Sequence, residues 1–131
     1  MLNVLVVDDS MIIRRNLKKM LTELGCNVIA EAANGQEAIE LYVKHNPDAV
    51  TMDITMPVMT GIEALKEIRK NYSDAVIIMV TSHGQEDLVM DAIKSGAKGY
   101  MLKPINIDKL AQVFKKAFPN MKFKTDEELL V

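Results

Sequence analysis

The sequence predicts an α/β protein built on a doubly wound parallel sheet of five strands with five helices. Short, almost wholly apolar runs alternate five times with amphipathic stretches along the chain. Runs without an alternating polar face are typical of parallel strands that are covered on both sides. Repeated strand–helix units favour an open sheet with right-handed crossovers. At 131 residues, the chain is long enough to form one domain with its own core.

The predicted strands are rich in apolar and β-branched residues. In chain order they span residues 3–8, 27–32, 48–53, 75–80 and 99–103. Each run is short and is separated from the next by one amphipathic stretch. No internal linker, repeat or low-complexity segment interrupts the pattern, which favours one continuous domain.

The predicted helices are recognised by apolar residues at helical spacing. The five stripes are Ile13, Leu17, Met20, Leu21 and Leu24; Ala38, Leu41 and Tyr42; Leu65, Ile68 and Tyr72; Leu88, Ala92 and Ile93; and Ile107, Leu110, Ala111, Phe114 and Phe118. Gly25 is expected to end the first helix, and Pro47 follows the second. Thr60 and Glu63 have the spacing of a capping box at the start of the third helix. The fourth helix is expected to end near Gly96.

Composition excludes several classes of protein. A net charge of −2 gives no basic field that would favour nucleic acid. The single cysteine, Cys26, excludes an internal disulfide, fits a reducing compartment and is expected to be buried. No apolar run approaches the roughly 18 residues that a membrane span needs. We therefore expect a cytoplasmic protein that contacts neither nucleic acid nor membrane directly.

The carboxyl ends of the predicted strands carry side chains suited to one common site. Ligands of open α/β sheets bind beyond these ends. The residues there are Asp8 and Asp9 after the first strand, Asp53 at the third, Thr81 and Ser82 at the fourth, and Lys103 with Pro104 at the fifth. The second strand ends in the chemically quiet residues 32–34. Each polar residue alone suits a turn, a cap or the surface, but their joint placement favours a binding site.

Two adjacent carboxylates at one strand end need a counterion. Like charges about 5 Å apart repel by roughly 3 kcal/mol at an effective dielectric constant of about 20. Oxygen ligands with room for water suit Mg²⁺, which would remove this repulsion. With a metal and Lys103 nearby, the missing partner is an anion with several oxygens, such as a phosphoryl group. An Asp can act as the nucleophile that forms an acyl phosphate, while the cations stabilise the transferring oxygens.

Four motifs carry a resemblance to a known family. They are VVDDS at 6–10, DITMPVMTG at 53–61, VTSHG at 80–84 and YMLKP at 100–104. The sequence resembles the receiver domain of bacterial two-component response regulators, most closely the single-domain chemotaxis (CheY-like) type. The resemblance implies a flavodoxin-like fold with strand order 2-1-3-4-5. It also implies a receiver domain over residues 1–118, followed by a short C-terminal tail over residues 119–131.

The resemblance assigns a phosphoacceptor and a metal site. Asp53 corresponds to the aspartate that receives the phosphoryl group and also binds the metal. Asp9 corresponds to a direct ligand of Mg²⁺, and Asp8 to one that reaches the ion through water. The backbone carbonyl of Thr55 completes the implied set of protein ligands.

The resemblance also assigns the residues that respond to phosphorylation. Lys103 corresponds to the lysine that contacts the phosphoacceptor and then the phosphoryl group, and a cis peptide bond before Pro104 is implied. Thr81 corresponds to the switch hydroxyl, and Tyr100 to the aromatic residue that follows it inward. Ser82 stands where members usually carry alanine, beside the phosphate-binding pocket, so we expect altered rates of phosphorylation or hydrolysis.

The resemblance also implies that Thr55 and His83 flank the path of the water that hydrolyses the acyl phosphate. These two positions vary within the family, so the sequence does not fix the lifetime of the phosphorylated state. Two further expectations concern residues outside the site. His45 is expected at an exposed helix end. Arg14, Arg15, Lys18 and Lys19 are expected on the outer face of the first helix, where the family also contacts its kinase.

The implied function is a phosphorylation-activated signalling switch. A sensor histidine kinase would donate the phosphoryl group from a phosphohistidine, and a possible phosphatase would help to remove it. The chain would catalyse only its own phosphorylation and dephosphorylation. Only a short stretch follows the fifth predicted helix, so we expect another protein to read the output through residues 86–118. By resemblance this reader is a target such as a flagellar-motor switch protein in chemotaxis.

Three alternatives use the same fold or chemistry. The first alternative is that the chain is a receiver fragment of a larger transcriptional regulator. In the second it is a Mg²⁺-dependent phosphatase with an Asp nucleophile, which is disfavoured because Thr55 stands where such enzymes need a second acid. A flavodoxin is the third, and it is disfavoured because two carboxylates occupy the place of its phosphate-binding loop.

Overall fold

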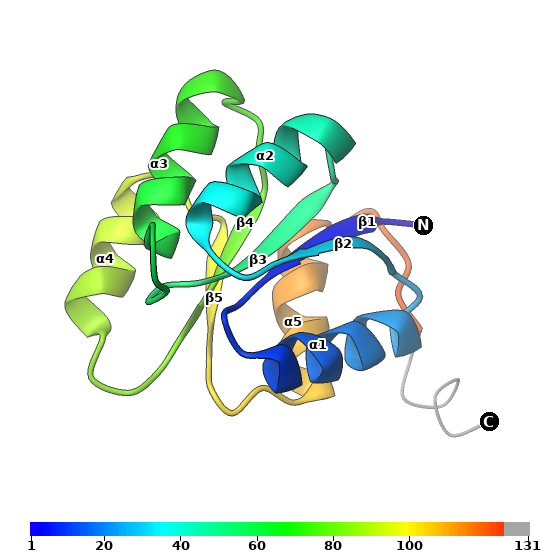
Figure 1. Cartoon of the computed structure of the whole chain (residues 1–131). Helices are drawn as coiled ribbons and strands as arrows, with labels where there is room; N and C mark the ends of the chain where they lie inside the picture. Colours follow the sequence, from blue (N-terminus) through cyan, green and yellow to red (C-terminus); the bar gives the residue numbers. More distant parts are fainter. Residues whose placement is uncertain (125–131) are drawn as a thin grey trace.

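Strands and helices alternate strictly along the chain (Figure 1). The computed structural model describes residues 1–124, so part of the predicted tail, 125–131, lies outside the described residues. The elements are β1 (Asn3–Val7), α1 (Met11–Glu23), β2 (Asn27–Ala32), α2 (Gly35–His45), β3 (Ala49–Asp53), α3 (Gly61–Asn71), β4 (Ile77–Thr81), α4 (Glu86–Lys94), β5 (Gly99–Leu102) and α5 (Ile107–Ala117). The predicted strands agree within one or two residues at their ends.

The five strands form one parallel sheet with the order β2-β1-β3-β4-β5, which confirms the predicted fold class and strand order. Figure 1 shows α1 and α5 on one face of this sheet and α2, α3 and α4 on the other. Because all strands run in the same direction, their carboxyl ends meet at one edge. Asp53 ends β3 at that edge, paired in register with Val80 of β4.

The core consists of two hydrophobic layers, one on each face of the sheet. Along β1, Leu5 and Val7 pack into the layer under α2, α3 and α4, whereas Val4 and Val6 pack into the layer under α1 and α5. All four side chains are buried. Both faces of the strand are therefore covered, which explains why its sequence shows no polar alternation.

Most helices begin with a side-chain cap. In α3, the Thr60 side chain accepts a hydrogen bond from the Glu63 N–H while the Glu63 carboxylate accepts one from the Thr60 N–H, each at 3.2 Å. The predicted capping box is thus present. Gly25 follows α1 with φ of +95°, a left-handed conformation that favours glycine.

Helix α4 packs differently from its prediction. Leu88 and Ile93, two members of the predicted stripe, are 41% and 40% exposed. Ala92 is its buried residue, and Val89 packs against the same layer of the core. Apolar residues lie on several sides of this helix, so the predicted stripe is confirmed at Ala92 and wrong at Leu88 and Ile93.

The first part of the predicted tail lies against the domain. Phe123 is buried, and its ring meets that of Phe114 edge-on with centroids 6.1 Å apart. The Lys124 N–H donates to the Leu24 carbonyl at 3.2 Å. Within residues 1–124, no helix has the length and apolar character to cross a membrane.

Candidate functional site

Asp53 is fixed by the close approach of two backbones. The Gly61 N–H, at the start of α3, donates to the Ile54 carbonyl at 2.8 Å. A Cβ atom at Gly61 would lie only 1.9 Å from the Asp53 carbonyl oxygen, so only glycine fits at this contact. The helix start therefore lies directly against the strand end, and Asp53 is buried there, with 6% of the residue exposed.

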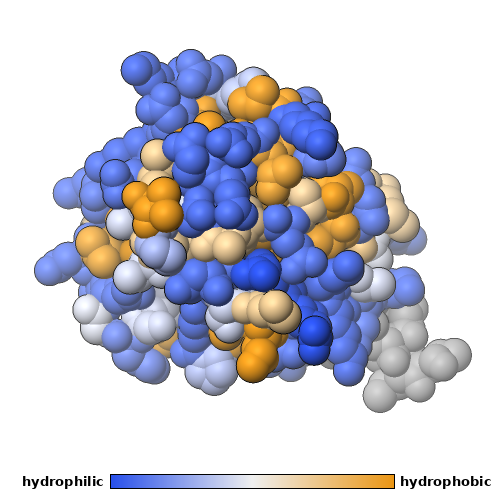
Figure 2. Space-filling view, in the orientation of Figure 1, coloured by the Kyte–Doolittle hydropathy of each residue, from blue (hydrophilic) through white to orange (hydrophobic). Residues whose placement is uncertain are grey.

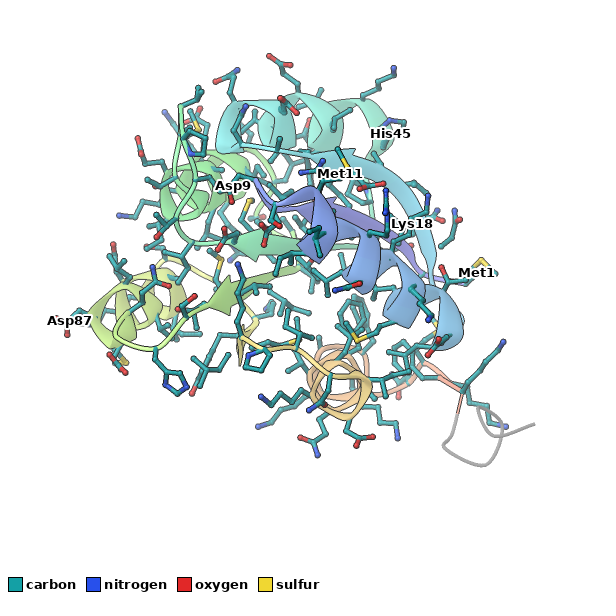
Figure 3. The ribbon with its side chains drawn as sticks, turned by 60° about the horizontal axis from the view of Figure 1, so that its bottom comes forward. Met1, Asp9, Met11, Lys18, His45 and Asp87 are labelled. Atoms are coloured by element: carbon teal, nitrogen blue, oxygen red, sulfur yellow. The ribbon has the colours of Figure 1, made fainter. Side chains whose placement is uncertain are left out.

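Three carboxylates gather at the carboxyl edge of the sheet. Asp8, Asp9 and Asp53 each offer one oxygen, and these oxygens all lie within 4.8 Å of one another. Asp8 is buried, and its Oδ1 accepts a hydrogen bond from the Ser10 N–H at 2.9 Å. Asp9 is exposed in the loop between β1 and α1 (Figure 3). The cluster thus has two buried members and one that faces solvent.

Lys103 supplies the positive charge of the site. Its Nζ lies 3.2 Å from Asp8 Oδ2 and 3.6 Å from Asp53 Oδ1. The Lys103 N–H donates to the Thr81 carbonyl at 2.7 Å, which holds the residue beside the end of β4. The Lys103–Pro104 peptide bond is cis, as the resemblance implies.

One lysine does not offset three carboxylates. Burial, and after it the neighbouring Asp8 carboxylate, raise the pKa of Asp53 to about 6, while Lys103 opposes the rise. Asp8 Oδ2 is buried without a hydrogen-bond partner, because the ammonium group lies near it in a geometry that makes only an ionic contact. Three clustered carboxylates with a single ammonium group beside them fit a hard divalent cation such as Mg²⁺.

The residues assigned to the switch lie around this cluster. Thr81 is buried at the end of β4, and its hydroxyl donates to the Oε1 of Gln85 at 2.8 Å. Tyr100 of β5 is 52% exposed. Ser82 and His83 are exposed in the loop after β4. The Thr81 hydroxyl is therefore committed to a neighbour in its own loop.

Two residues with contacts at the site were not anticipated from the sequence. Gln85 is the first. Arg14 is the second, and its predicted place on the outer face of α1 is wrong: its side chain is largely buried, one guanidinium nitrogen donates to the Asp8 carbonyl at 2.7 Å, and Nε lies 3.2 Å from Glu31 Oε1. Neither residue shows a periodic signal, because each acts by reaching across a loop or to a neighbouring strand.

Residues expected outside the site lie outside it. Arg15, Lys18 and Lys19 are exposed along α1. His45 is exposed at the last position of α2, at the end of that helix far from Asp9 (Figure 3). Cys26 is buried, and burial raises the pKa of its thiol to about 11.

A parallel sheet of order 2-1-3-4-5 with an acid cluster and a lysine at its carboxyl edge defines a receiver-type domain. The family model of the response regulator receiver domain matches residues 4–115, and the chain belongs to this family. It is a response regulator that phosphorylation activates. The predicted family is thereby confirmed.

Individual relatives cover nearly the whole chain. The chemotaxis protein CheY of Bacillus subtilis (strain 168) is 47% identical over 113 residues, which are 86% of this chain and 94% of that protein. The CheY of Thermotoga maritima is 46% identical over the same shares of the two chains. A solved structure of the CheX–CheY–BeF3–Mg²⁺ complex from Borrelia burgdorferi is similar with a TM-score of 0.86 and 41% identity, covering 89% of each chain.

Proposed function

We propose that Asp53 accepts a phosphoryl group from the phosphohistidine of a sensor histidine kinase, in a reaction that depends on Mg²⁺. The observation that supports this most directly is the burial of Asp53 beside a lysine ammonium, that of Lys103, which also contacts Asp8. The raised pKa of Asp53 marks a carboxylate whose charge is incompletely balanced. A bound cation and a transferring anion would complete that balance.

The transfer exchanges one bond to phosphorus for another. A carboxylate oxygen of Asp53 forms the new O–P bond, the P–N bond to the donor imidazole breaks, and the leaving imidazole takes up a proton. Lys103, 3.6 Å from Asp53 Oδ1, offsets negative charge on the transferring oxygens. The chain in this role catalyses only its own phosphorylation and dephosphorylation.

The metal would be held by residues of the acid cluster. Asp9 and Asp53 would bind it directly, Asp8 would reach it through water, and the Thr55 carbonyl would complete the protein ligands. When bound, Mg²⁺ supplies positive charge beside the carboxylates and the phosphoryl oxygens. The approach of the three carboxylates to within 4.8 Å of one another supports this assignment.

The output is proposed to be a change of surface over residues 86–118. Thr81 would turn toward the phosphoryl group, and Tyr100, now 52% exposed, would rotate inward into the space that Thr81 leaves. Phosphorylation then shifts a population of conformers that already exists. The Tyr100→Ala variant should lose phosphorylation-dependent partner binding while still labelling on Asp53.

The relatives suggest the setting in which this switch acts. Because the Bacillus subtilis and Thermotoga maritima relatives are chemotaxis proteins, we propose a cytoplasmic role in chemotaxis. The reader would be a target such as a flagellar-motor switch protein. The Borrelia burgdorferi relative forms a complex with CheX, which makes a protein of that kind a candidate partner.

A labelling experiment tests the proposed function. The protein is incubated with acetyl phosphate, and acid-labile phosphate on the chain is measured with Mg²⁺ and with excess chelator. We expect labelling only with the cation, and none in the Asp53→Asn variant. Asp48→Asn, which changes a carboxylate outside the cluster, is the matched control and should label like the parent. Labelling of Asp53→Asn, or labelling in excess chelator, would contradict the proposal.

A further inference from the structure

Gln85 uses its whole side-chain amide at the edge of the site. Its Oε1 accepts from the Thr81 hydroxyl at 2.8 Å and from the Ser82 N–H at 2.9 Å, and its Nε2 donates to Thr55 Oγ1 at 2.7 Å. Gln85 is also the N-cap residue of α4, yet its side chain makes no capping hydrogen bond. The side chain therefore serves the loops beside Asp53 and not the helix that it precedes.

The amide connects the two loops that flank the phosphoacceptor. Thr55 lies two residues after Asp53 in the loop before α3, whereas Thr81 ends β4 and Ser82 follows it. Gly84 adopts φ of +89°, and a Cβ atom there would meet nothing within 4 Å. Backbone conformation and not space thus favours glycine at this position, where the chain turns back so that Gln85 reaches Thr81.

Two hydrogen-bond donors at the end of β4, the Thr81 hydroxyl and the Ser82 N–H, share one acceptor, the Gln85 Oε1. A phosphoryl oxygen on the neighbouring strand end can receive the Thr81 hydroxyl or the Ser82 N–H only after the Gln85 oxygen has released it. Each exchange replaces one hydrogen bond by another, and the balance decides which state is populated. An acceptor that holds both donors in the resting form therefore opposes the phosphorylated form.

We infer that Gln85 is a positioning residue that holds the resting form: its amide oxygen occupies the Thr81 and Ser82 donors, and its amide nitrogen ties their loop to Thr55. This inference rests on the proposed function of Asp53. Gln85 also lines a groove of about 380 Å³ together with Ile93 and Tyr100. When the Thr81 hydroxyl and the Ser82 N–H turn to phosphate, they release the Gln85 side chain. The wall of the groove that Gln85 forms beside α4 and β5 then changes.

Two substitutions of Gln85 act in opposite directions. Gln85→Met keeps the length of the side chain and removes all three hydrogen bonds, so it frees both donors. Gln85→Glu keeps the accepting oxygen and gives it a charge, which strengthens its bonds to both donors, and its contact with Thr55 then has the Thr55 hydroxyl as the donor. Gln36→Met, an equivalent change on the exposed surface of α2, is the matched control.

The test measures the affinity of each protein for beryllofluoride, a mimic of the phosphoryl group, at saturating Mg²⁺. Because a net hydrogen bond is worth a factor of several in an equilibrium constant, we expect Gln85→Met to bind about threefold to tenfold more tightly and Gln85→Glu to bind more weakly by a similar factor. The Ser82 amide proton resonance should move upfield in Gln85→Met and downfield in Gln85→Glu before any beryllofluoride is added. Gln36→Met should change neither quantity.

The outcomes separate this inference from the proposed function. Unchanged or weaker beryllofluoride binding by Gln85→Met, with Asp53-dependent labelling intact, would overturn the role of Gln85 alone. A Ser82 amide proton that does not respond to either substitution would overturn it as well. Absence of labelling and of beryllofluoride binding in the parent protein would overturn the proposed function, and this inference with it.

Discussion

Helices α3 and α4 follow neighbouring strands that both end at the site, yet they are attached to the domain very differently. Helix α3 begins with a complete capping box and buries five residues, Gly61, Ile62, Ala64, Leu65 and Ile68. Helix α4 begins without a side-chain cap and buries only Ala92. Three of its large hydrophobic side chains, Leu88, Met90 and Ile93, are exposed. Figure 2 shows hydrophobic residues in separate patches on one hydrophilic face of the molecule.

This difference divides the site into a fixed half, which contains Asp53 and α3, and a movable half, which contains Thr81 and α4. Asp53 lies against the start of α3, where backbone contact, capping and burial all hold the chain. Thr81 leads into α4, where few buried contacts oppose a local rearrangement. A switch needs a reacting group that stays in place and a responding segment that does not. The four predictions below test this division, beginning with the largest expected effect.

The backbone contact between Gly61 and Asp53, in the fixed half of the site, is predicted to leave no room for a side-chain atom at Gly61. Gly61→Ala places a Cβ atom 1.9 Å from the Asp53 carbonyl oxygen, so the backbone must shift and break the bond to Ile54. We expect the free energy of unfolding in urea to fall by at least about 3 kcal/mol. Gly84→Ala, in the movable half, adds strain at positive φ but meets open space and should cost only about 1 kcal/mol. Equal losses in the two variants would contradict the division.

The buried charge of the fixed half is predicted to cost stability when no cation is bound. The pKa of Asp53 rises from an ordinary 3.8 to about 6 in the folded protein. A raised pKa means that its contribution to stability is fully present below pH 3.8 and is lost as pH rises through 6. Asp53→Asn should therefore be more stable than the parent by about 1–3 kcal/mol at pH 8 and equal to it near pH 3.5.

Adding and removing Mg²⁺ sharpens this prediction. The cation should raise the melting temperature of the parent at pH 8, where Asp53 is ionised, more than at pH 5, where it is mostly protonated. Asp53→Asn should gain much less at either pH, and chelator should reverse the gain. A stabilisation by Mg²⁺ that is as large in Asp53→Asn as in the parent would place the ion elsewhere.

The cap of the fixed half is predicted to contribute a smaller amount. Thr60→Ala removes the acceptor of the Glu63 N–H and should lower the free energy of unfolding by about 1 kcal/mol. Amide hydrogen exchange should become faster in the first turn of α3, toward the rate in the first turn of α4, which has no such cap. Thr60→Ser retains the accepting hydroxyl and should keep most of the protection. Equal losses in the two variants would show that the hydroxyl does not act as a cap.

The same contrast explains which parts of the structure can be predicted from sequence. The elements and the acid cluster follow from the chain itself, because apolar runs define parallel strands and parallel strands place Asp8, Asp53 and Lys103 at one edge. The order of the strands does not follow from periodicity and came from the resemblance. In helix α4 the burial of Ala92 was predicted correctly, but Leu88 and Ile93 were assigned to the buried face in place of the equally apolar Val89. Apolar residues on several sides of α4 make its buried face ambiguous in the sequence, and the same distribution leaves large hydrophobic side chains exposed in the structure.

The contacts of Arg14 and Gln85 had no comparable signal. Gln85 joins two loops through an amide, and Arg14 reaches from α1 to the end of β1. Both contacts depend on the path of a loop and on a side-chain rotamer. Neither a spacing nor a residue type specifies these features, so they become visible only in the folded chain.

The smallest effect is predicted for the ion pair that joins the two halves. Lys66 of α3 lies 3.4 Å from Asp91 of α4, and the two side chains are 53% and 49% exposed. Solvent and salt screen such a pair, and ordering two long side chains opposes it, so Asp91→Asn should change the free energy of unfolding by less than about 0.5 kcal/mol. Lys66→Gln and the double variant complete a cycle whose coupling energy should be equally small. A coupling above about 1 kcal/mol would mean that α3 holds α4 in place, and the movable half would then have to move with the fixed one.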